Sequence, residues 1–226
     1  MLVLVYNEDS NQIERYNRSL GQPMPYVNNS WLTLKEFRGS SKSTILWTTK
    51  SAMRAFYTTR ARFGSGIYVG YAFKRIFEGG HSGQSQHYAG VSFDTGQRWT
   101  YSKRKTLYNL ARKLGIWSYV EPISDTPTWI HFDKRNKKSA CSSGYPLVKQ
   151  GSKSNYVMIL QDALNNMGRP LTIDGVFGNN TKSAVINFQK YYGLKVDGIV
   201  GCNTWRKIAS IANGMGKSNY TKYYNG

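Results

Sequence analysis

The sequence predicts an α+β domain followed by a small all-α bundle. Strand-like and helix-like segments mix in the first part of the chain without a βαβ rhythm. A polar, small-residue-rich segment then interrupts the apolar pattern, and beyond it apolar residues recur at helical spacing. We therefore predict four parts: a first domain, a linker, a three-helix bundle and a polar tail, at residues 1–135, 136–146, 147–212 and 213–226.

The first domain is predicted to contain helices and short strands. Thr48–Phe63 and Ser102–Leu114 each carry apolar residues on one helical face. Short runs with strand-like alternation or β-branched and aromatic residues predict strands at Ile67–Phe73, Val91–Phe93, Trp117–Val120 and Thr128–Phe132.

The predicted bundle contains an internal repeat. A helical pattern ends at Gly168, and the block Leu171–Thr181 then recurs 23 residues later as Leu194–Thr204. Each block has an Asp-Gly pair, which favours a tight turn, and ends on a threonine that can cap the next helix. The repeat thus predicts three short helices joined by two matching loops.

This stretch resembles the peptidoglycan-binding type 1 module. The resemblance rests on Gln161, on Asp174-Gly-Val-Phe-Gly and on Val196-Asp-Gly-Ile-Val-Gly, and it ends at Thr204-Trp. It covers about Leu147–Ile211 and implies a binding module without catalytic residues. The loop residues beside the two Asp-Gly turns are our candidates for ligand contact.

The charge of the chain points to an anionic partner. Lys and Arg number 31 against 12 Asp and Glu, which gives a formal net charge of +19. We expect peptidoglycan and anionic wall polymers, because no nucleic-acid motif is recognised and no apolar run approaches the roughly 20 residues of a membrane span. No signal peptide is visible, so an extracellular or cell-wall protein would need release by lysis or sporulation. We expect a monomer.

The two cysteines lack the spacing of a metal site. Cys141 and Cys202 form no CxxC pair, so a cysteine-based zinc site is not expected. Whether they form a disulfide or remain free thiols is left open by the sequence.

Two of the three histidines lie in settings that suit a metal. His87 is followed by Gly90, which permits a sharp bend, and by Asp94 at the end of a short strand. His131 lies on a strand and shares a face with Trp129 and Asp133. Two imidazoles and one carboxylate make a three-ligand zinc set that leaves a position for water. Zinc lowers the pKa of that water and polarises a carbonyl.

These two motifs resemble those of the D-alanyl-D-alanine carboxypeptidase-type zinc peptidases. That group includes vancomycin-resistance dipeptidases and phage L-alanyl-D-glutamate endopeptidases, and it shares its α+β fold with the hedgehog signalling domain. The motifs are Ser85-x-His-x-x-Gly-x-x-x-Asp and Trp129-x-His, within about Ile67–Asp133. The resemblance implies that Zn²⁺ is held by His87, Asp94 and His131.

The resemblance also suggests substrate contacts. The segment Val69–Arg75 is similar to a family strand that bears a basic, substrate-facing residue ahead of the first motif. The residues that we expect to contact substrate are Lys74, Arg75 and Ser85. His81 lies in a glycine-rich loop and either contacts substrate or is simply solvated.

The general base departs from the family pattern. Many members carry Glu or Asp three residues before the last histidine ligand, where this chain has Thr128. Glu121, followed by proline as in a family Glu-Pro-Trp-His motif, and Asp125 are the alternatives. Asp133 is either a partner of the ligand histidine or a salt-bridged strand end.

The sequence therefore predicts a zinc peptidase that hydrolyses an amide bond of the cell-wall stem peptide and is anchored by its C-terminal module. Two alternatives stay open: a peptidoglycan amidase, and a non-catalytic wall-binding protein with a degenerate zinc site. Carboxypeptidase and endopeptidase activity are not distinguished, nor are roles in phage lysis, spore germination or wall turnover.

Overall fold

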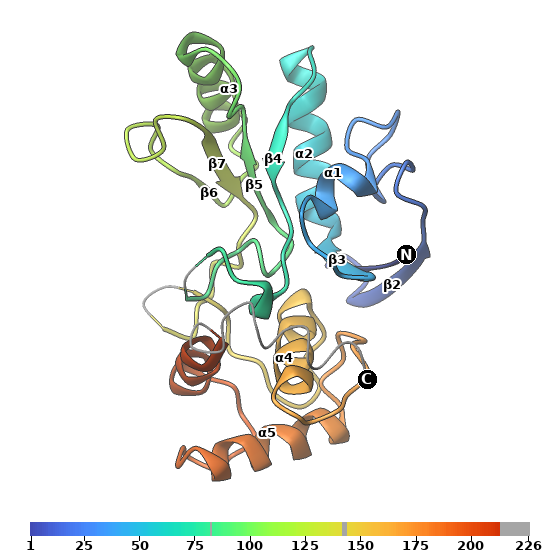
Figure 1. Cartoon of the computed structure of the whole chain (residues 1–226), viewed down its shortest axis with the longest axis vertical. Helices are drawn as coiled ribbons and strands as arrows, with labels where there is room; N and C mark the ends of the chain where they lie inside the picture. Colours follow the sequence, from blue (N-terminus) through green and yellow to red (C-terminus); the bar gives the residue numbers. More distant parts are fainter. Residues whose placement is uncertain (82, 142–143, 213–226) are drawn as a thin grey trace.

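The computed structural model describes residues 1–81, 83–141 and 144–212. An α+β region with two sheets is followed by a C-terminal region of three helices, which confirms the α+β class predicted for the first region and the all-α class predicted for the second (Figure 1). The predicted tail at 213–226 lies outside the described residues. None of the described helices has the length and apolar character that a membrane span requires.

The first sheet was not predicted from the sequence. Its strands β1 (Leu2–Asn7), β2 (Gln12–Asn17) and β3 (Ile45–Thr49) lie in the order β2-β1-β3, and β1 runs antiparallel to β2 and parallel to β3. The short helix α1 (Leu34–Arg38) lies between β2 and β3 in the chain. The central strand is buried on both faces, which explains its uninterrupted apolar run.

The second sheet carries the residues of the zinc motifs. Strands β4 (Val69–Tyr71), β5 (Ser92–Thr95), β6 (Tyr119–Val120) and β7 (Ile130–Asp133) form an antiparallel sheet in the order β4-β5-β7-β6. Alternation along β5 and β7 puts Phe93 and Phe132 in the core, so Asp94 and His131 face the other way. The elements around this sheet are α2 (Lys50–Phe63), the 3₁₀ turn η1 (Ile76–Glu78) and α3 (Tyr101–Leu114).

The C-terminal region consists of α4 (Asn155–Asn166), α5 (Asn179–Tyr191) and helical residues 202–212. Its two loops have the same hydrogen-bond network. Gln161 Nε2 donates to Asp174 Oδ1, Val176 O and Thr181 Oγ1 at 2.7, 3.1 and 3.2 Å, and its Oε1 accepts from the amides of Asp174 and Gly175.

The second loop repeats this network from Gln189. Its Nε2 donates to Asp197 Oδ1, Ile199 O and Thr204 Oγ1 at 3.1, 2.9 and 3.3 Å, and its Oε1 accepts from the amides of Asp197 and Gly198. The polar residues of the repeat therefore stabilise the two loops through hydrogen bonds within the fold. That loop residues beside the Asp-Gly turns contact ligand stays a prediction.

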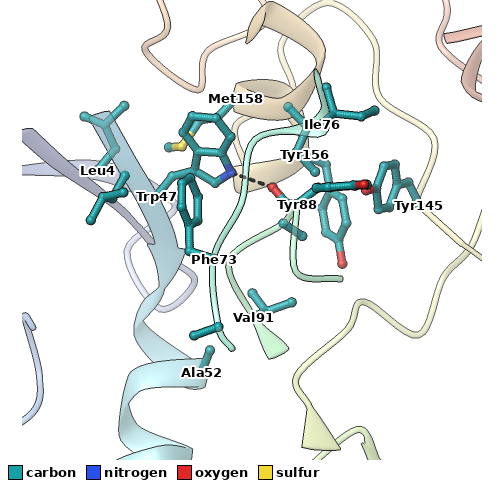
Figure 2. Close-up of a cluster of buried hydrophobic side chains, with 14 of the residues drawn as sticks. Leu4, Trp47, Ala52, Phe73, Ile76, Tyr88, Val91, Tyr145, Tyr156 and Met158 are labelled. Atoms are coloured by element: carbon teal, nitrogen blue, oxygen red, sulfur yellow. Dashed lines mark hydrogen bonds between the residues drawn. The ribbon is translucent and has the colours of Figure 1, made fainter. Parts of the chain in front are cut away.

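The two regions share one hydrophobic core. Tyr156 and Met158 of α4 belong to the same buried cluster as Trp47, whose indole Nε1 donates to Tyr88 O at 2.8 Å (Figure 2). A buried ion pair of Arg75 with Asp162 also joins the first region to α4, with 4% and 0% of the two side chains exposed. The bundle is therefore packed onto the first region.

The segment expected to be a linker is packed as well. Tyr145 is fully buried and donates its hydroxyl to Ser85 O at 2.7 Å. Cys141 and Cys202 form a disulfide with a Cα–Cα distance of 5.0 Å, which settles the question that the sequence left open. The exact boundaries of the four predicted parts stay predictions.

Candidate metal centre

A cavity of about 490 Å³ opens beside the second sheet. Strands β5 and β7 and the loop before β5 contribute its histidines and Asp94, and the C-terminal region contributes Arg206. The lining residues used below are His81, Ser85, His87, Asp94, Glu121, Trp129, His131, Arg135, Cys141 and Arg206.

Sheet register brings the predicted ligands together. Asp94 and His131 are directly opposite each other on β5 and β7, with His131 Nδ1 2.7 Å from Asp94 Oδ1. His87 approaches from the preceding loop, with Nε2 3.3 Å from Asp94 Oδ2. That loop needs Gly90, which has φ 67° and where a Cβ would lie 1.9 Å from Trp47 O. The glycine of the motif thus lets the loop pass close against β3.

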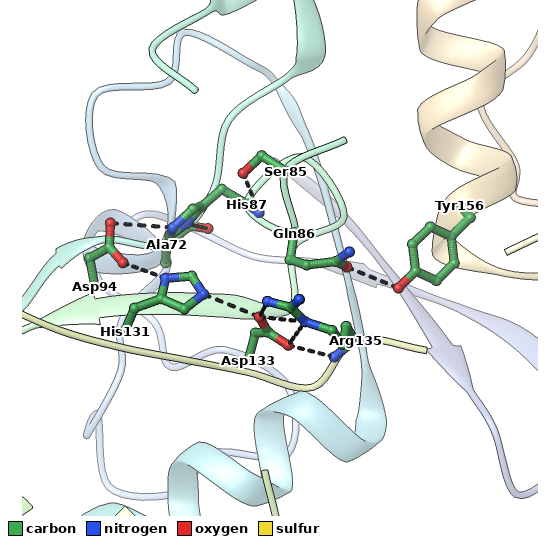
Figure 3. Close-up of polar contacts among 9 residues, drawn as sticks. All are labelled: Ala72, Ser85, Gln86, His87, Asp94, His131, Asp133, Arg135 and Tyr156. Carbon is green, nitrogen blue, oxygen red and sulfur yellow. Dashed lines mark hydrogen bonds and ion pairs between the residues drawn. The ribbon is translucent and has the colours of Figure 1, made fainter. Parts of the chain in front are cut away.

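Both imidazoles are held at the nitrogen that faces away from Asp94. His87 Nδ1 lies 3.0 Å from Ala72 O, and His131 Nε2 lies 3.1 Å from Asp133 Oδ2 (Figure 3). Metal-ligating histidines usually donate their second ring nitrogen to a carbonyl or carboxylate in this way. His87 Nε2 is buried and forms an ion pair with Asp94 Oδ2 at 3.3 Å. Two imidazoles fixed in this way beside a carboxylate are donor types that suit a metal ion.

The neighbouring charges shift the pKa values of Asp94 and His131 in opposite directions. Burial opposes ionisation of Asp94, but hydrogen bonds from His131 and His87 outweigh it and hold the pKa of the carboxyl well below its usual range. Burial similarly opposes charge on His131, yet the adjacent Asp133 and Asp94 raise its pKa to about 9. A metal bound at Nδ1 would displace that proton, so metal binding and proton release are coupled here.

His81 is a further candidate ligand that the sequence did not assign to the metal. The ligand atoms of His81, His87 and Asp94 all lie within 4.8 Å of one another. Burial, followed by the neighbouring His87, lowers the pKa of His81 to about 4, so its ring is neutral near pH 7. The structure thus presents a possible His/His/Asp metal site with two histidines available beside the His87–Asp94 pair.

Ring geometry distinguishes these two histidines. The His81 and His87 rings are stacked, with centroids 4.3 Å apart and an interplanar angle of 23°. His131 and His87 are instead T-shaped at 5.3 Å and 72°. An imidazole lone pair lies in the ring plane, so stacked rings direct their lone pairs side by side while crossed rings can direct them to one point. By ring geometry His131 is an alternative to His81 as the partner of His87, although the group whose ligand atoms all lie within 4.8 Å contains His81 and not His131.

The candidate bases occupy different surroundings. Glu121 lines the cavity, and its backbone amide donates to His131 O at 3.0 Å, which places it next to β7. Asp125 is exposed, does not line the cavity, and accepts from the Ser124 hydroxyl at 2.9 Å. Asp133 is fully buried beneath His131 and is held by the Arg135 guanidinium, whose Nε lies 2.8 Å from Asp133 Oδ1.

The expected substrate contacts also separate. Ser85 lines the cavity and its hydroxyl accepts from the His87 amide at 3.3 Å. The Lys74 ammonium lies 5.8 Å from the centre of the Tyr71 ring, near the histidines. Arg75 does not reach the cavity, because its guanidinium is buried against Asp162 of α4. The prediction that Arg75 contacts substrate does not fit this placement.

Comparison with known proteins identifies the C-terminal region. Residues 153–208 match the family described as "Putative peptidoglycan binding domain". An uncharacterized protein from the bpoA1 3′ region of Kitasatospora aureofaciens is 42% identical over 71 residues, which cover 30% of this chain and 58% of that protein. The zinc D-Ala-D-Ala carboxypeptidase of Streptomyces albus G is 41% identical over 74 residues, or 31% of this chain and 29% of that enzyme.

A third relative carries the name of a different hydrolase. The spore cortex-lytic enzyme of Oceanobacillus iheyensis is 31% identical over 96 residues, which cover 42% of this chain and 33% of that enzyme. The chain thus spans between 29% and 58% of the length of these relatives. What the comparisons establish is that the C-terminal part of the chain, at residues 153–208, is of the peptidoglycan binding type.

Proposed function

We propose that this chain is a zinc-dependent hydrolase of the peptidoglycan stem peptide, anchored to the wall by its C-terminal region. The observation that carries the proposal is the pair of crossed imidazoles of His87 and His131, each fixed at its far nitrogen and turned toward Asp94 beside an open cavity. The motifs support a first region of the D-alanyl-D-alanine carboxypeptidase type.

The proposed ligands are His87 Nε2, an Asp94 oxygen and His131 Nδ1. When bound, zinc would supply a Lewis acid that lowers the pKa of a water and polarises the scissile carbonyl. Ala72 O and Asp133 fix the two rings, so the inner nitrogens need little reorganisation.

Glu121 is the proposed proton acceptor. Its side chain lines the cavity, and its backbone is bonded to that of His131, whereas Asp125 is exposed outside the lining. A base must come within hydrogen-bond reach of the attacking water and then return the proton to the leaving amine. Trp129 lines the same cavity.

The C-terminal region would hold the enzyme on its polymer. Anchoring raises the local concentration of substrate, and a net charge of +19 favours anionic wall polymers, with binding that weakens in salt. The Cys141–Cys202 disulfide supports an oxidising location such as the cell wall or the extracellular space.

A non-catalytic wall-binding protein is the second candidate. It is favoured by Thr128, which replaces the acid that many zinc peptidases of this type carry at that position. An amidase would use a similar centre, and the relatives carry the names of more than one kind of wall hydrolase. Product analysis separates these functions.

The test is digestion of purified peptidoglycan by the wild type and by His131→Ala, with zinc content measured and products identified by mass spectrometry. We expect about one zinc per wild-type chain, as a three-ligand site implies, and new termini within the stem peptide from the wild type alone. Release of intact stem peptide from the glycan would indicate an amidase. Wall binding by zinc-loaded wild type without any cleavage would reject the hydrolase and support the non-catalytic wall-binding protein.

A further inference from the structure

We propose that the C-terminal region also forms part of the substrate site, and that Arg206 receives a carboxylate of the peptide substrate. Arg206 lies on helical residues 202–212, yet it lines the same cavity as His87, Asp94 and His131. The inference rests on the proposed hydrolysis of an acidic peptide, and it gives the bundle a second role beside anchoring.

Buried contacts join the start of the helical residues 202–212 to the loop that carries His87. Trp205, the neighbour of Arg206, is fully buried, and its indole Nε1 donates to Pro146 O at 2.8 Å. Its ring packs edge-on against Tyr145 at 5.1 Å, and the Tyr145 hydroxyl donates to Ser85 O at 2.7 Å. Ser85 belongs to the same loop as His87. The position of Arg206 is therefore coupled to the metal motif by packed side chains.

Two further contacts hold the same wall. The disulfide joins Cys141, which lines the cavity, to Cys202 at the start of the helical residues. Gly144 has φ 105°, and a Cβ there would lie 2.6 Å from Gln84 Oε1, the atom that accepts from the Tyr145 amide at 2.7 Å. The segment before the bundle thus lies directly against the loop that leads to His87.

Arg206 is the available cation of this cavity. Only two Lys or Arg residues belong to its lining as described, Arg135 and Arg206. The Arg135 guanidinium is bonded to Asp133 and lies 4.2 Å from the centre of the Tyr119 ring. Arg206 is exposed and forms no ion pair with an acidic side chain in the described part of the chain.

An unpaired cation at this place suits a peptide that carries a carboxylate. The carboxylates of the lining, Asp94 and Glu121, are offset by the proposed zinc and by Arg135, so Arg206 is left to pair with a carboxylate of the peptide. A guanidinium stays protonated at all working pH values and can bind a carboxylate through two parallel hydrogen bonds. Arg206 would bind the carboxylate and so orient the peptide. The substrate class is therefore a peptide with a free carboxylate near the cleaved bond.

The test uses the full chain loaded with zinc, as wild type, Arg206→Gln, Arg206→Lys and Lys207→Gln. Lys207→Gln removes the same charge from the adjacent position, where the ammonium lies 4.9 Å from the centre of the Tyr192 ring and does not line the cavity. The probes are a synthetic stem pentapeptide with free carboxylates and its fully amidated counterpart. Binding is measured by calorimetry and cleavage by mass spectrometry, and sedimentation with purified peptidoglycan measures anchoring.

We expect Arg206→Gln to bind the free-carboxylate peptide about tenfold more weakly than the wild type, as expected for the loss of a charge-assisted hydrogen bond. The effect should appear in KM, with kcat, zinc content and sedimentation unchanged. The amidated peptide should bind all four proteins alike, Arg206→Lys should recover part of the affinity, and Lys207→Gln should match the wild type.

The outcomes separate this inference from the proposed function. Cleavage with equal peptide affinity in wild type and Arg206→Gln would overturn the role of Arg206 and leave the hydrolase intact. Carboxylate-dependent binding that requires Arg206, without any cleavage, would support the site and reject hydrolysis of this peptide. Absence of both binding and cleavage in the wild type would overturn both proposals for the stem peptide.

Discussion

The two Asp-Gly loops and the histidine cluster are both built from polar residues at regular spacing, but they use those residues in opposite ways. Gln161 makes five hydrogen bonds, all to atoms of the block Leu171–Thr181, and Gln189 does the same with the block Leu194–Thr204. In the cluster, the outer nitrogens of His87 and His131 are bonded, while the inner nitrogens face Asp94 and the cavity.

This contrast teaches how to separate a structural motif from a functional one. A motif whose donors and acceptors are all satisfied within the fold stabilises that fold, since any loss leaves buried partners unsatisfied. A motif that leaves buried ligand atoms turned toward a cavity carries a cost that a bound ion can offset. The two motifs should therefore respond differently to substitution.

The largest expected effect is the loss of zinc from His131→Ala. Removal of a ligand should weaken zinc binding by more than the 10–100-fold (roughly) that loss of a supporting contact costs, and should abolish cleavage. His81→Ala is the matched control, because the stacked His81 ring is expected to leave zinc stoichiometry unchanged. Zinc content after dialysis against a chelator measures both. Zinc retained by His131→Ala but lost from His81→Ala would reverse the assignment of the third ligand.

The second largest expected effect is a loss of stability when the glutamine of either Asp-Gly loop is replaced. Gln161→Ala and Gln189→Ala should each lower the free energy of unfolding by about 3 kcal/mol, because each leaves buried amides and a threonine hydroxyl without their partner. Denaturant titration measures the loss. Cleavage of a soluble peptide by the folded variants should persist. Lost peptidoglycan binding at unchanged stability would instead make these glutamines ligand contacts.

Asp133→Asn is expected to have a smaller effect on zinc binding, and it tests how much the carboxylate behind His131 contributes. The amide oxygen can still accept from His131 Nε2, but the negative charge behind the imidazole is gone. We expect zinc affinity to fall about 10–100-fold while the ligands remain in place. Competition with a chelator measures the zinc Kd, and denaturant titration checks the fold. An unchanged Kd would show that Asp133 serves only its ion pair with Arg135.

Much of this architecture was accessible from sequence pattern. The helical spacing of apolar residues predicted α2, α3, α4 and α5, and the Asp-Gly repeat predicted the two loops, because these signals are local. The first sheet was missed, since its pairing of β1 with β3 joins segments far apart in the sequence. The disulfide and the core shared with α4 depend on the same kind of long-range packing.

The prediction of the site was limited in the same way, because contacts between residues far apart in the sequence leave no local pattern. The spacing of His87, Asp94 and His131 suggested a ligand set, and the direct pairing of Asp94 with His131 on adjacent strands gives that spacing a geometric basis. The burial of Arg75 could not be read locally, because its partner Asp162 lies in the bundle. Nor could the place of Arg206, which reaches the cavity only because the bundle is packed against the loop before His87.

The smallest effect concerns acid stability of the second loop. The Ile199 amide, followed by Gln189 and Lys195, lowers the pKa of Asp197 against the opposing effect of burial. A lowered folded pKa means that this stabilisation is present above the unfolded pKa of about 3.9 and is lost as pH falls through the folded value. Asp197→Asn keeps an oxygen that can accept from the Ile199 amide, so it should cost well under about 1 kcal/mol at pH 7 and lessen the fall in stability below about pH 4. Denaturant midpoints of both proteins between neutral and acid pH measure this. If the loop motif is purely structural, the two curves converge in acid while zinc content at pH 7 is identical. A change of zinc content in Asp197→Asn would contradict the distinction between the Asp-Gly loops, whose polar groups are bonded within the fold, and the histidine cluster, whose inner nitrogens are proposed to bind a metal.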